Sequence, residues 1–306
     1  MTSSRSASVR ARRERPAVGV IGLGIMGSSI AANLQQAGFE VIGCDPVPAV
    51  RRRMRGRIAA VTTDVGEVLA GARRIITSLP SVAALEQVVQ ALADARTGRA
   101  RVLVAETSTL PVAAKQLARD HLAEAAIDLL DAPLSGTGAQ ARTRDLSVYA
   151  SGERAAVRTM RPVFAGFARQ CHEVGEFGAG MRMKLVANLL VAIHNVAAAE
   201  ALLFAERLGL DPRQALAVVA DGAGGSRMLQ VRGPAMVGRS WHEATMKVEV
   251  WRKDMRLIHE ALEAANVPAP LFAACQPIYA AALAQGHALD DTAAVYAVLE
   301  RMAQAS

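Results

Sequence analysis

Residues 17–45 contain the pattern that most restricts how this chain can fold. A short apolar run at Ala17–Ile21 leads into a G-x-G-x-x-G turn, and a helical pattern follows as far as Ala37. A second apolar run at residues 41–44 ends at Asp45, about 20 residues after the first glycines. A strand, a glycine turn, a helix, a second strand and an acidic residue in this order predict the first unit of a dinucleotide-binding Rossmann sheet.

Each part of this unit has an expected contact with the cofactor. Gly24 lets the pyrophosphate approach backbone N–H groups, and Gly27 lets the helix pack on the strand. The Asp45 carboxylate accepts the ribose hydroxyls and repels a 2′-phosphate, so we expect NAD rather than NADP. Arg51, Arg52 and Arg53 either reach such a phosphate or form a solvated helix face. The turn residues expected to bind the cofactor are Gly22, Leu23, Gly24, Ile25, Met26 and Gly27.

Two further strand–helix units are expected at Arg74–Thr77 and at residues 101–105. The carboxyl ends of strands in a doubly wound sheet line the cofactor crevice. The cofactor-binding candidates at these two strand ends are therefore Leu79, Pro80, Ser108 and Thr109. The hydroxyl groups there either contact the nicotinamide side or cap the next helix, and both interpretations stay open.

A glycine-rich stretch, D-A-P-L-S-G-T-G, follows a predicted strand at residues 127–130. Such a turn is suited to presenting backbone N–H groups to an anion, although an ordinary loop is the alternative. Residues 146–150 and 170–174 are predicted strands that flank a helix near residues 155–167.

Residues 175–208 predict a long buried helix, because no Gly or Pro interrupts them between Gly180 and Gly209. At ~100° per residue, Lys184, Asn188 and Asn195 share one narrow stripe. Buried polar side chains need partners, so interhelical hydrogen bonds or a lysine reaching the surface are one interpretation. A catalytic lysine is the other, because burial shifts a lysine pKa towards a useful range.

The remaining chain is almost wholly helical, with breaks expected near Gly209, Gly222, Gly233-Pro234 and Pro268. We expect three parts: a disordered basic leader at residues 1–15, a Rossmann domain at 16–177 and an all-helical substrate and dimerisation domain at 178–306. Arg227, at an expected helix start, is either a second anion contact or an exposed arginine.

Composition excludes several other classes of protein. The chain has 306 residues, 52% of them hydrophobic, and its net charge of +7 includes +4 from residues 1–15. The body is therefore not an obvious nucleic-acid binder. Three distant cysteines indicate neither a metal site nor disulfides and fit a reducing, cytoplasmic compartment. No apolar run reaches the ~20 residues of a membrane helix.

Three blocks resemble the β-hydroxyacid dehydrogenase family, which includes 3-hydroxyisobutyrate dehydrogenase, tartronate-semialdehyde reductase and L-threonate dehydrogenase. They are GLGIMGSSIAANLQQAGFEVIGCD at residues 22–45, DAPLSGTGAQA at 131–141, and GAGMRMKLVANL at 178–189, supported by Lys253-Asp254. The second block is similar to the family's substrate-binding DAPVSGG motif and the third to its catalytic-lysine motif. Together they span nearly the whole chain after residue 15.

The resemblance implies roles for individual residues. Lys184 would be the catalytic acid/base and Asn188 would orient the substrate or the lysine. Ser135, with the backbone of Gly136 and Thr137, would hold a substrate carboxylate, and Lys253 would close over nicotinamide or substrate. Ser108 or Thr109 would match a cofactor contact of the family.

Three positions depart from the family pattern. Thr137 replaces a glycine, so a positive φ there would be strained. Ala187 replaces the first of two adjacent asparagines, and Asp145 replaces the usual glycine before Leu146. These changes affect the expected substrate more than the chemistry. Imine reductases share the architecture but lack the lysine, so Lys184 argues against them.

The sequence therefore predicts an NAD-dependent oxidoreductase that moves a hydride between a small 3-hydroxy acid, similar to 3-hydroxyisobutyrate, and nicotinamide. Alternatives are a tartronate-semialdehyde or L-threonate type of substrate, or a non-catalytic dinucleotide-binding module. We expect a small carboxylate substrate, no metal, no nucleic-acid or membrane partner, and a homodimer or homotetramer.

Overall fold

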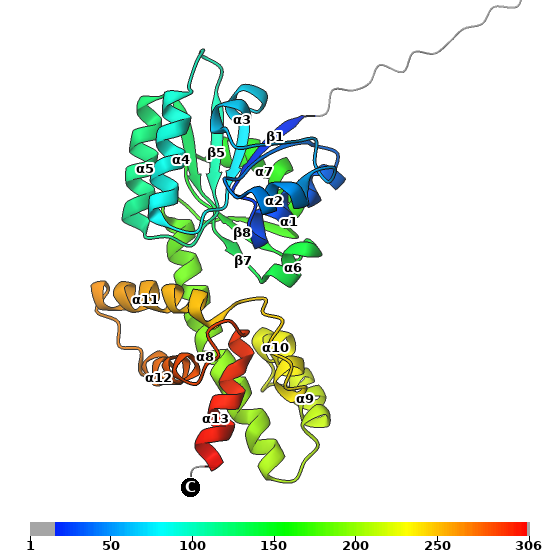
Figure 1. Cartoon of the computed structure of the whole chain (residues 1–306). Coiled ribbons are helices and arrows are strands. Elements are labelled where there is room, and N and C mark those ends of the chain that lie inside the picture. Colours follow the sequence, from blue (N-terminus) through cyan, green and yellow to red (C-terminus); the bar gives the residue numbers. More distant parts are fainter. Residues whose placement is uncertain (1–15, 305–306) are drawn as a thin grey trace, which may run out of the picture.

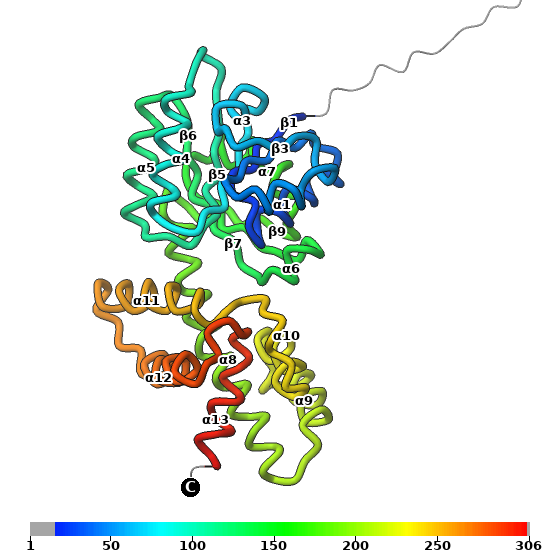
Figure 2. The backbone as a smooth tube through the Cα atoms, in the orientation of Figure 1, coloured from blue at the N-terminus to red at the C-terminus, as the bar shows by residue number. Residues whose placement is uncertain are grey.

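The computed structural model describes residues 16–304, so the expected leader at residues 1–15 lies outside the described residues. A lobe built on β-sheets and a lobe of helices are joined by one long helix, which continues from the first lobe through the second (Figures 1 and 2). This is the predicted fold class, a Rossmann-like sheet followed by an all-helical part.

The main sheet has six strands in the order β3-β2-β1-β4-β5-β6, and all neighbouring pairs are parallel. Its nearly continuous apolar strands fit a sheet that helices cover on both faces. The sequence does not predict β3, which is short and only partly buried. The strands are β1 Ala17–Ile21, β2 Glu40–Cys44, β3 Ala60–Thr62, β4 Arg74–Thr77, β5 Val102–Glu106 and β6 Ile127–Asp131.

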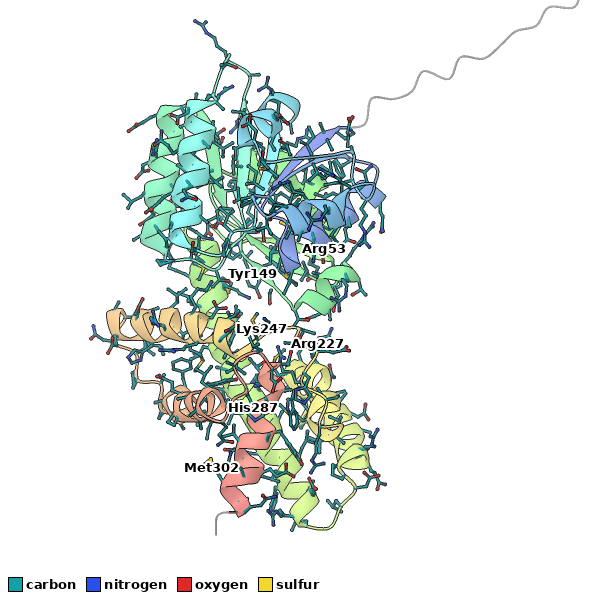
Figure 3. All side chains as sticks on the ribbon, in the orientation of Figure 1. Arg53, Tyr149, Arg227, Lys247, His287 and Met302 are labelled. Atoms are coloured by element: carbon teal, nitrogen blue, oxygen red, sulfur yellow. The ribbon has the colours of Figure 1, made fainter. Side chains whose placement is uncertain are left out.

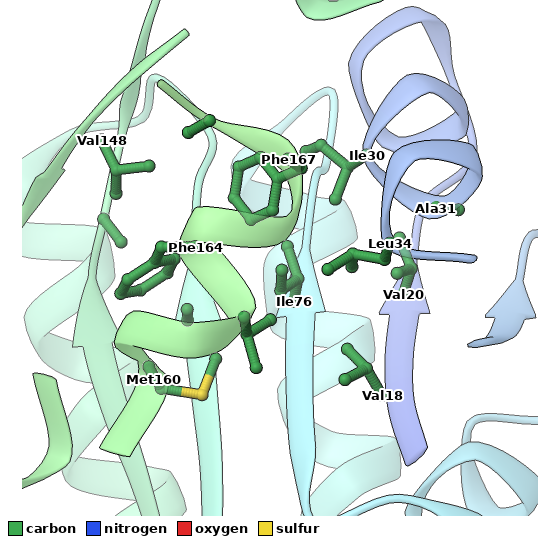
Figure 4. Close-up of a cluster of buried hydrophobic side chains, with 14 of the residues drawn as sticks. Val18, Val20, Ile30, Ala31, Leu34, Ile76, Val148, Met160, Phe164 and Phe167 are labelled. Atoms are coloured by element: carbon green, nitrogen blue, oxygen red, sulfur yellow. The ribbon is translucent and has the colours of Figure 1, made fainter. Parts of the chain in front are cut away.

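Two layers of helices bury the faces of this sheet. On one face, Phe164 and Phe167 of α7 pack with Ile30 of α1 against Val20 and Ile76 of the strands (Figure 4). Full burial of each such side chain contributes about 1.5–3 kcal/mol. The other face is covered by α3, α4 and α5. The helices of this lobe are α1 Ile25–Gln36, α2 Pro48–Met54, α3 Val65–Gly71, α4 Val82–Asp94, α5 Val112–Glu124, α6 Gly138–Arg142 and α7 Arg154–Phe167.

A second, three-stranded sheet lies after β6 and contains β7 Leu134–Ser135, β8 Ser147–Ala150 and β9 Gln170–Glu173. The two strands expected around α7 are present, β8 and β9, and they pair in parallel. Their third partner, β7, comes from the stretch that the sequence indicated as a glycine-rich turn, and it pairs antiparallel with β8. The expected anion loop is thus anchored at one end by a strand and at the other by α6.

The helical lobe is organised around α8, Ala179–Arg207, a helix of 29 residues. Within residues 16–304 it is the one helix whose length and composition would suit a membrane span. It is instead a core helix, because α9, α10, α11, α12 and α13 all pack on it. The surrounding helices are α9 Pro212–Asp221, α10 Arg227–Val237, α11 Val248–Ala264, α12 Pro270–Ala284 and α13 Val295–Gln304, with a 3₁₀ turn at Thr292–Ala294.

One expected break is wrong. Gly233-Pro234 lies inside α10, which continues to Val237. A Cβ on Gly233 would overlap the Leu216 side chain. It would lie only 3.4 Å from Leu216 Cγ and closer still to both Leu216 methyl groups. The glycine therefore serves close packing of α10 on α9, and the surrounding contacts outweigh the helix-breaking tendency of the pair.

Candidate functional site

The glycine turn has the geometry that a dinucleotide requires. Gly22 has φ +88°, and a Cβ there would overlap Ser78 O. A Cβ on Gly27 would overlap Gly22 O, so this glycine allows α1 to approach the turn. By contrast, a Cβ on Gly24 would meet no protein atom within 4 Å. The backbone at Gly24 therefore faces open space, where a pyrophosphate can approach the N-terminus of α1.

Asp45 is buried beside this turn at the end of β2. Its Oδ2 accepts the Leu23 N–H at 2.8 Å, and its Oδ1 accepts the Val47 N–H at 2.8 Å. Two of the three neighbouring arginines also reach this region. Arg51 Nη1 donates to Asp45 O at 2.7 Å, and Arg53 Nη2 donates to Leu23 O at 3.4 Å. The carboxylate and two guanidinium groups thus lie around one end of the turn.

The next two strand ends are connected to each other. Ser108 Oγ accepts the Leu79 N–H at 2.7 Å, while the Pro80 side of the loop is exposed. No side chain caps α5, whereas Ser81 caps α4 by accepting the Ala84 N–H. Ser108 therefore joins the loops that follow β4 and β5 and caps neither helix.

The predicted substrate loop begins at Ser135, the last residue of β7. Gly136 takes the positive φ of +132°, and Thr137 has an ordinary φ of −94°. The positive φ that would strain a threonine therefore falls on Gly136, and Thr137 avoids it. Thr137 instead forms a capping box with Gln140 at the start of α6, and its N–H donates to Gln140 Oε1 at 3.0 Å.

This arrangement decides which donors of the loop remain available. The Thr137 N–H already has an acceptor in Gln140. Neither the Ser135 hydroxyl nor the Gly136 N–H has a hydrogen-bond partner within residues 16–304. Ser135 and Gly136 are thus the groups that can bind a carboxylate without breaking an existing bond.

The first turn of α8 is fixed to the sheet lobe by the buried carboxylate of Asp131. Asp131 Oδ2 accepts the Met181 N–H at 2.7 Å, and Ser151 Oγ accepts the Gly180 N–H at 2.9 Å. Lys115 Nζ lies 2.8 Å from Asp131 Oδ1 and 2.7 Å from Glu106 Oε2, and all three charged side chains are fully buried. A negative charge at a helix N-terminus is favourable, so this triad positions α8 electrostatically as well.

Lys184 lies on α8 with only 8% of its surface exposed. Burial lowers its pKa, the Asp254 carboxylate opposes this by raising the pKa, and the Lys253 ammonium lowers it further. Asn188, one turn along α8, donates to Asp254 Oδ2 at 3.1 Å. Burial raises the pKa of Asp254, whereas Lys253 and Lys184 lower it. The four side chains form one polar cluster between α8 and α11.

Lys253 extends from α11 to the sheet lobe. Its Nζ donates to Thr109 O at 2.6 Å and lies 3.5 Å from Asp254 Oδ1. The loop after β5 and the polar cluster around Lys184 are therefore in direct contact.

The polar stripe on α8 serves two purposes. Asn195 donates to Tyr279 Oη at 3.0 Å and to Thr292 O at 2.9 Å, inside the core of the helical lobe. It makes the interhelical hydrogen bonds that the sequence offered as one interpretation. Lys184 and Asn188 instead face Asp254 near the junction of the lobes.

Two residues with a part in this geometry received no role from the sequence. The sequence indicates Asp254 only as a neighbour of Lys253 and assigns no role to Gln140. The Lys253-Asp254 pair in the sequence is a signal for the first, because an acidic residue beside the lysine faces the same cluster. Within the described residues no three His, Cys, Asp or Glu side chains gather to hold a metal ion.

Two family models match this chain, each over a different part of it. Residues 17–175 match the family model for the "NAD binding domain of 6-phosphogluconate dehydrogenase", and residues 178–299 match "NAD-binding of NADP-dependent 3-hydroxyisobutyrate dehydrogenase".

Individual relatives are similar over almost the whole chain. An L-threonate dehydrogenase of Cupriavidus necator is 30% identical, over 91% of this chain and 94% of that protein. A 2-hydroxy-3-oxopropionate reductase of Escherichia coli is 30% identical, over 94% and 98%. The solved structure of 3-hydroxyisobutyrate dehydrogenase from Mycobacterium tuberculosis with L-serine has a TM-score of 0.82 at 28% identity, over 93% and 99%.

Proposed function

This chain belongs to the β-hydroxyacid dehydrogenase family and is an NAD(P)-dependent 3-hydroxyacid dehydrogenase or reductase, and we propose that its substrate resembles 3-hydroxyisobutyrate and its preferred cofactor is NAD. The observation that carries the chemistry is the buried Lys184 on α8, which shares a polar cluster with Asn188 and Asp254. Family membership favours this enzyme over the non-catalytic dinucleotide-binding module.

The cofactor would be held by residues 22–27, by Asp45 and by the loops that carry Leu79, Pro80, Ser108 and Thr109. Open space beside Gly24 and the polar environment of Asp45 fit a dinucleotide. When bound, the nicotinamide would supply the group that exchanges a hydride with the carbinol carbon of the substrate. The preference for NAD is supported by the Asp45 carboxylate, since a 2′-phosphate beside it would be repelled.

The substrate carboxylate would be bound by the Ser135 hydroxyl and the Gly136 N–H, both of which are free to donate. Thr137 shapes the same loop through its capping box with Gln140. Two donors on a loop held at both ends orient the substrate without much rearrangement, which lowers the entropy cost of reaching the reactive geometry.

Lys184 would accept the proton of the substrate hydroxyl during oxidation and return it during reduction. A lysine of ordinary pKa, ~10.4, is protonated near neutral pH and cannot act as a base. Burial lowers the pKa of Lys184 and so increases the neutral fraction. Asn188 would orient the substrate hydroxyl or the amine, and Asp254 would limit how far the pKa falls.

A panel of small hydroxy acids tests this function. The purified full-length protein is incubated with NAD or NADP and with 3-hydroxyisobutyrate, L-threonate or glycerate, and the absorbance of reduced nicotinamide is followed. The proposal expects the highest kcat/KM with NAD and 3-hydroxyisobutyrate. Highest activity with L-threonate or glycerate would assign the alternative substrate type, and no activity with any hydroxy acid would contradict the proposal.

We further propose a cytoplasmic homodimer or homotetramer, with residues 178–306 as the substrate and dimerisation domain. The exposed apolar side chains Phe204, Leu208 and Leu210 at the end of α8 support self-association. All three cysteines are free, which fits a reducing compartment. Light scattering of the purified protein measures the assembly directly, and a monomer at all concentrations would contradict it.

A further inference from the structure

An ion pair joins the two lobes on the side of α10. Arg227 Nη2 lies 2.7 Å from Asp145 Oδ2. Arg227 is the first residue of α10 in the helical lobe, and Figure 3 shows it at the top of that lobe, facing the sheet lobe. Asp145 lies in the segment between α6 and β8 of the sheet lobe. The pair therefore bridges the junction beside the loop that carries Ser135 and Gly136.

Asp145 connects this bridge to the substrate loop. Its Oδ2 also accepts the Gln140 side-chain N–H at 3.0 Å, and Gln140 Oε1 accepts the Thr137 N–H at 3.0 Å. Three consecutive polar contacts thus lead from Arg227 through Asp145 and Gln140 to Thr137. These contacts and nearby cations keep the pKa of Asp145 low, so its carboxylate stays charged.

The remaining contacts of Asp145 lie within the sheet lobe. Arg169 Nε donates to Asp145 Oδ1 at 2.9 Å, and the Asp145 N–H donates to Gln140 O at 2.9 Å. Separation of the lobes would break the contact with Arg227 and leave these two intact. Arg227 is therefore the partner of Asp145 whose presence depends on how the lobes are arranged.

Helix stability does not account for an arginine at this position. A positive charge in the first turn of a helix is unfavourable, because the N-terminus carries a partial positive charge. The cap of α10 is already supplied by Ser226, whose hydroxyl accepts the Leu229 N–H at 3.1 Å. The contact with Asp145 is the interaction that compensates for the position of Arg227.

We propose that Arg227 is a positioning residue for substrate binding. It forms an ion pair with Asp145 across the junction and so holds the Ser135–Gly136 loop in its binding geometry when the lobes are together. The inference rests on the proposed function, because it assigns substrate binding to that loop. It adds a link between the arrangement of the lobes and the affinity for substrate, which the polar cluster around Lys184 alone does not provide.

The test compares Arg227→Gln with the full-length wild-type protein. Because exposed ion pairs are weak, we expect KM for the hydroxy acid to rise about two- to five-fold, with kcat and the KM for NAD little changed. High ionic strength screens the pair, so the difference between variant and wild type should shrink there. Arg227→Lys, which keeps the charge, should recover most of the affinity.

Arg169→Gln is the matched control. Arg169 and Arg227 have similarly exposed side chains, 57% and 61%, and both bind Asp145, but only Arg227 reaches it from the other lobe. Arg169→Gln should leave the substrate KM unchanged. In an Asp145→Asn background, Arg227→Gln should have no further effect, because the charge that it binds is already absent.

Two kinetic outcomes overturn the proposal. One is a substrate KM for Arg227→Gln equal to that of wild type; the other is an equal rise for Arg169→Gln, which would indicate a disturbance within the loop alone. Failure of the proposed function appears separately, as absence of NAD reduction by the wild type. Small-angle scattering of the same proteins then still tests whether the Arg227–Asp145 ion pair holds the lobes together. Only Arg227→Gln should increase the radius of gyration, and no increase would overturn the proposal.

Discussion

Asn188 Nδ2 donates a hydrogen bond of 3.1 Å to Asp254 Oδ2, and both side chains are buried where α8 meets α11. The bond holds a carboxylate against the face of α8 that carries Lys184. Asp254 and Lys253 therefore act on the lysine in opposite directions, one favouring the ammonium and the other the neutral amine. This balance makes the cluster testable by both mutation and pH.

Lys184→Ala should abolish nearly all turnover while keeping the affinity for NAD. General acid–base assistance accounts for ~10²–10⁴ in rate, so kcat should fall by about that factor. Quenching of protein fluorescence by the dinucleotide measures binding, and the absorbance of reduced nicotinamide measures turnover. Asn188→Ala should be milder, lowering kcat and raising the substrate KM. Activity of Lys184→Ala within a few-fold of wild type would rule out the assigned role.

The pH profile should report the lowered pKa of Lys184. Oxidation needs the neutral amine, so kcat/KM for oxidation should rise with pH through an inflection below the ordinary lysine pKa. In the reductive direction it should fall through the same inflection. Asp254→Asn removes the charge that raises this pKa and should shift the inflection to lower pH, whereas Lys253→Gln should shift it to higher pH. Shifts of both variants in the same direction would contradict this electrostatic account.

Gly24→Ala and Gly27→Ala should separate cofactor binding from folding. A methyl group at position 24 meets no protein atom, whereas one at position 27 overlaps Gly22 O. Gly24→Ala should therefore weaken dinucleotide binding with little change in Tm. Gly27→Ala should lower Tm, because α1 must move away from the turn. Thermal unfolding and dinucleotide titration of both variants give the comparison, and unchanged dinucleotide affinity in Gly24→Ala would argue against a pyrophosphate at that position.

Asp45→Asn should reduce the preference for NAD over NADP. The amide oxygen keeps an acceptor for one of the Leu23 and Val47 N–H groups, and the charge that repels a 2′-phosphate is lost. Arg53→Gln should lower any residual activity with NADP, since Arg53 lies beside the same turn. Arg52→Gln, a change on the same helix at an exposed position, is the control. A ratio of kcat/KM values for the two cofactors that does not change in Asp45→Asn would contradict the assignment.

Lys115→Met should strongly destabilise the fold. The change leaves the Glu106 and Asp131 carboxylates buried without their cation, and breaking a buried ion pair in this way costs about 3–5 kcal/mol. Arg119→Gln on the same helix removes an exposed pair and should cost less than about 1 kcal/mol. Urea unfolding of both variants measures the difference.

Local sequence signals predict much of the fold and, with the family resemblance, name the main candidates of the site. The spacing from Gly22 to Asp45 and the uninterrupted length of α8 are properties of short stretches, and the structure has both elements. The strand β3 was missed because only three residues form it and its burial is partial. Its place in the sheet depends on pairing with β2, which no local pattern reveals.

The remaining features depend on contacts between distant residues. The sequence does not reveal that Gly136, and not Thr137, takes the positive φ, and the capping box depends on Gln140 being turned back towards the loop. Arg227 has a partner that is 82 positions away, and Asp254 meets Asn188 from 66 positions away. The first pair joins the two lobes and the second joins two helices of the helical lobe, so composition and periodicity carry no signal for either.

The attachment of α8 to Asp131 and Ser151 has a consequence for building hybrids of related enzymes. The matched family models divide between residues 175 and 178, which invites a splice at that point. Yet Gly180 and Met181 donate their N–H groups to side chains of the preceding lobe, and Gly180 has no room for a larger residue. A chimera joined downstream of Met181 would take these contacts of α8 from a single parent. One joined between residues 175 and 178 would have to re-form them between two different parents.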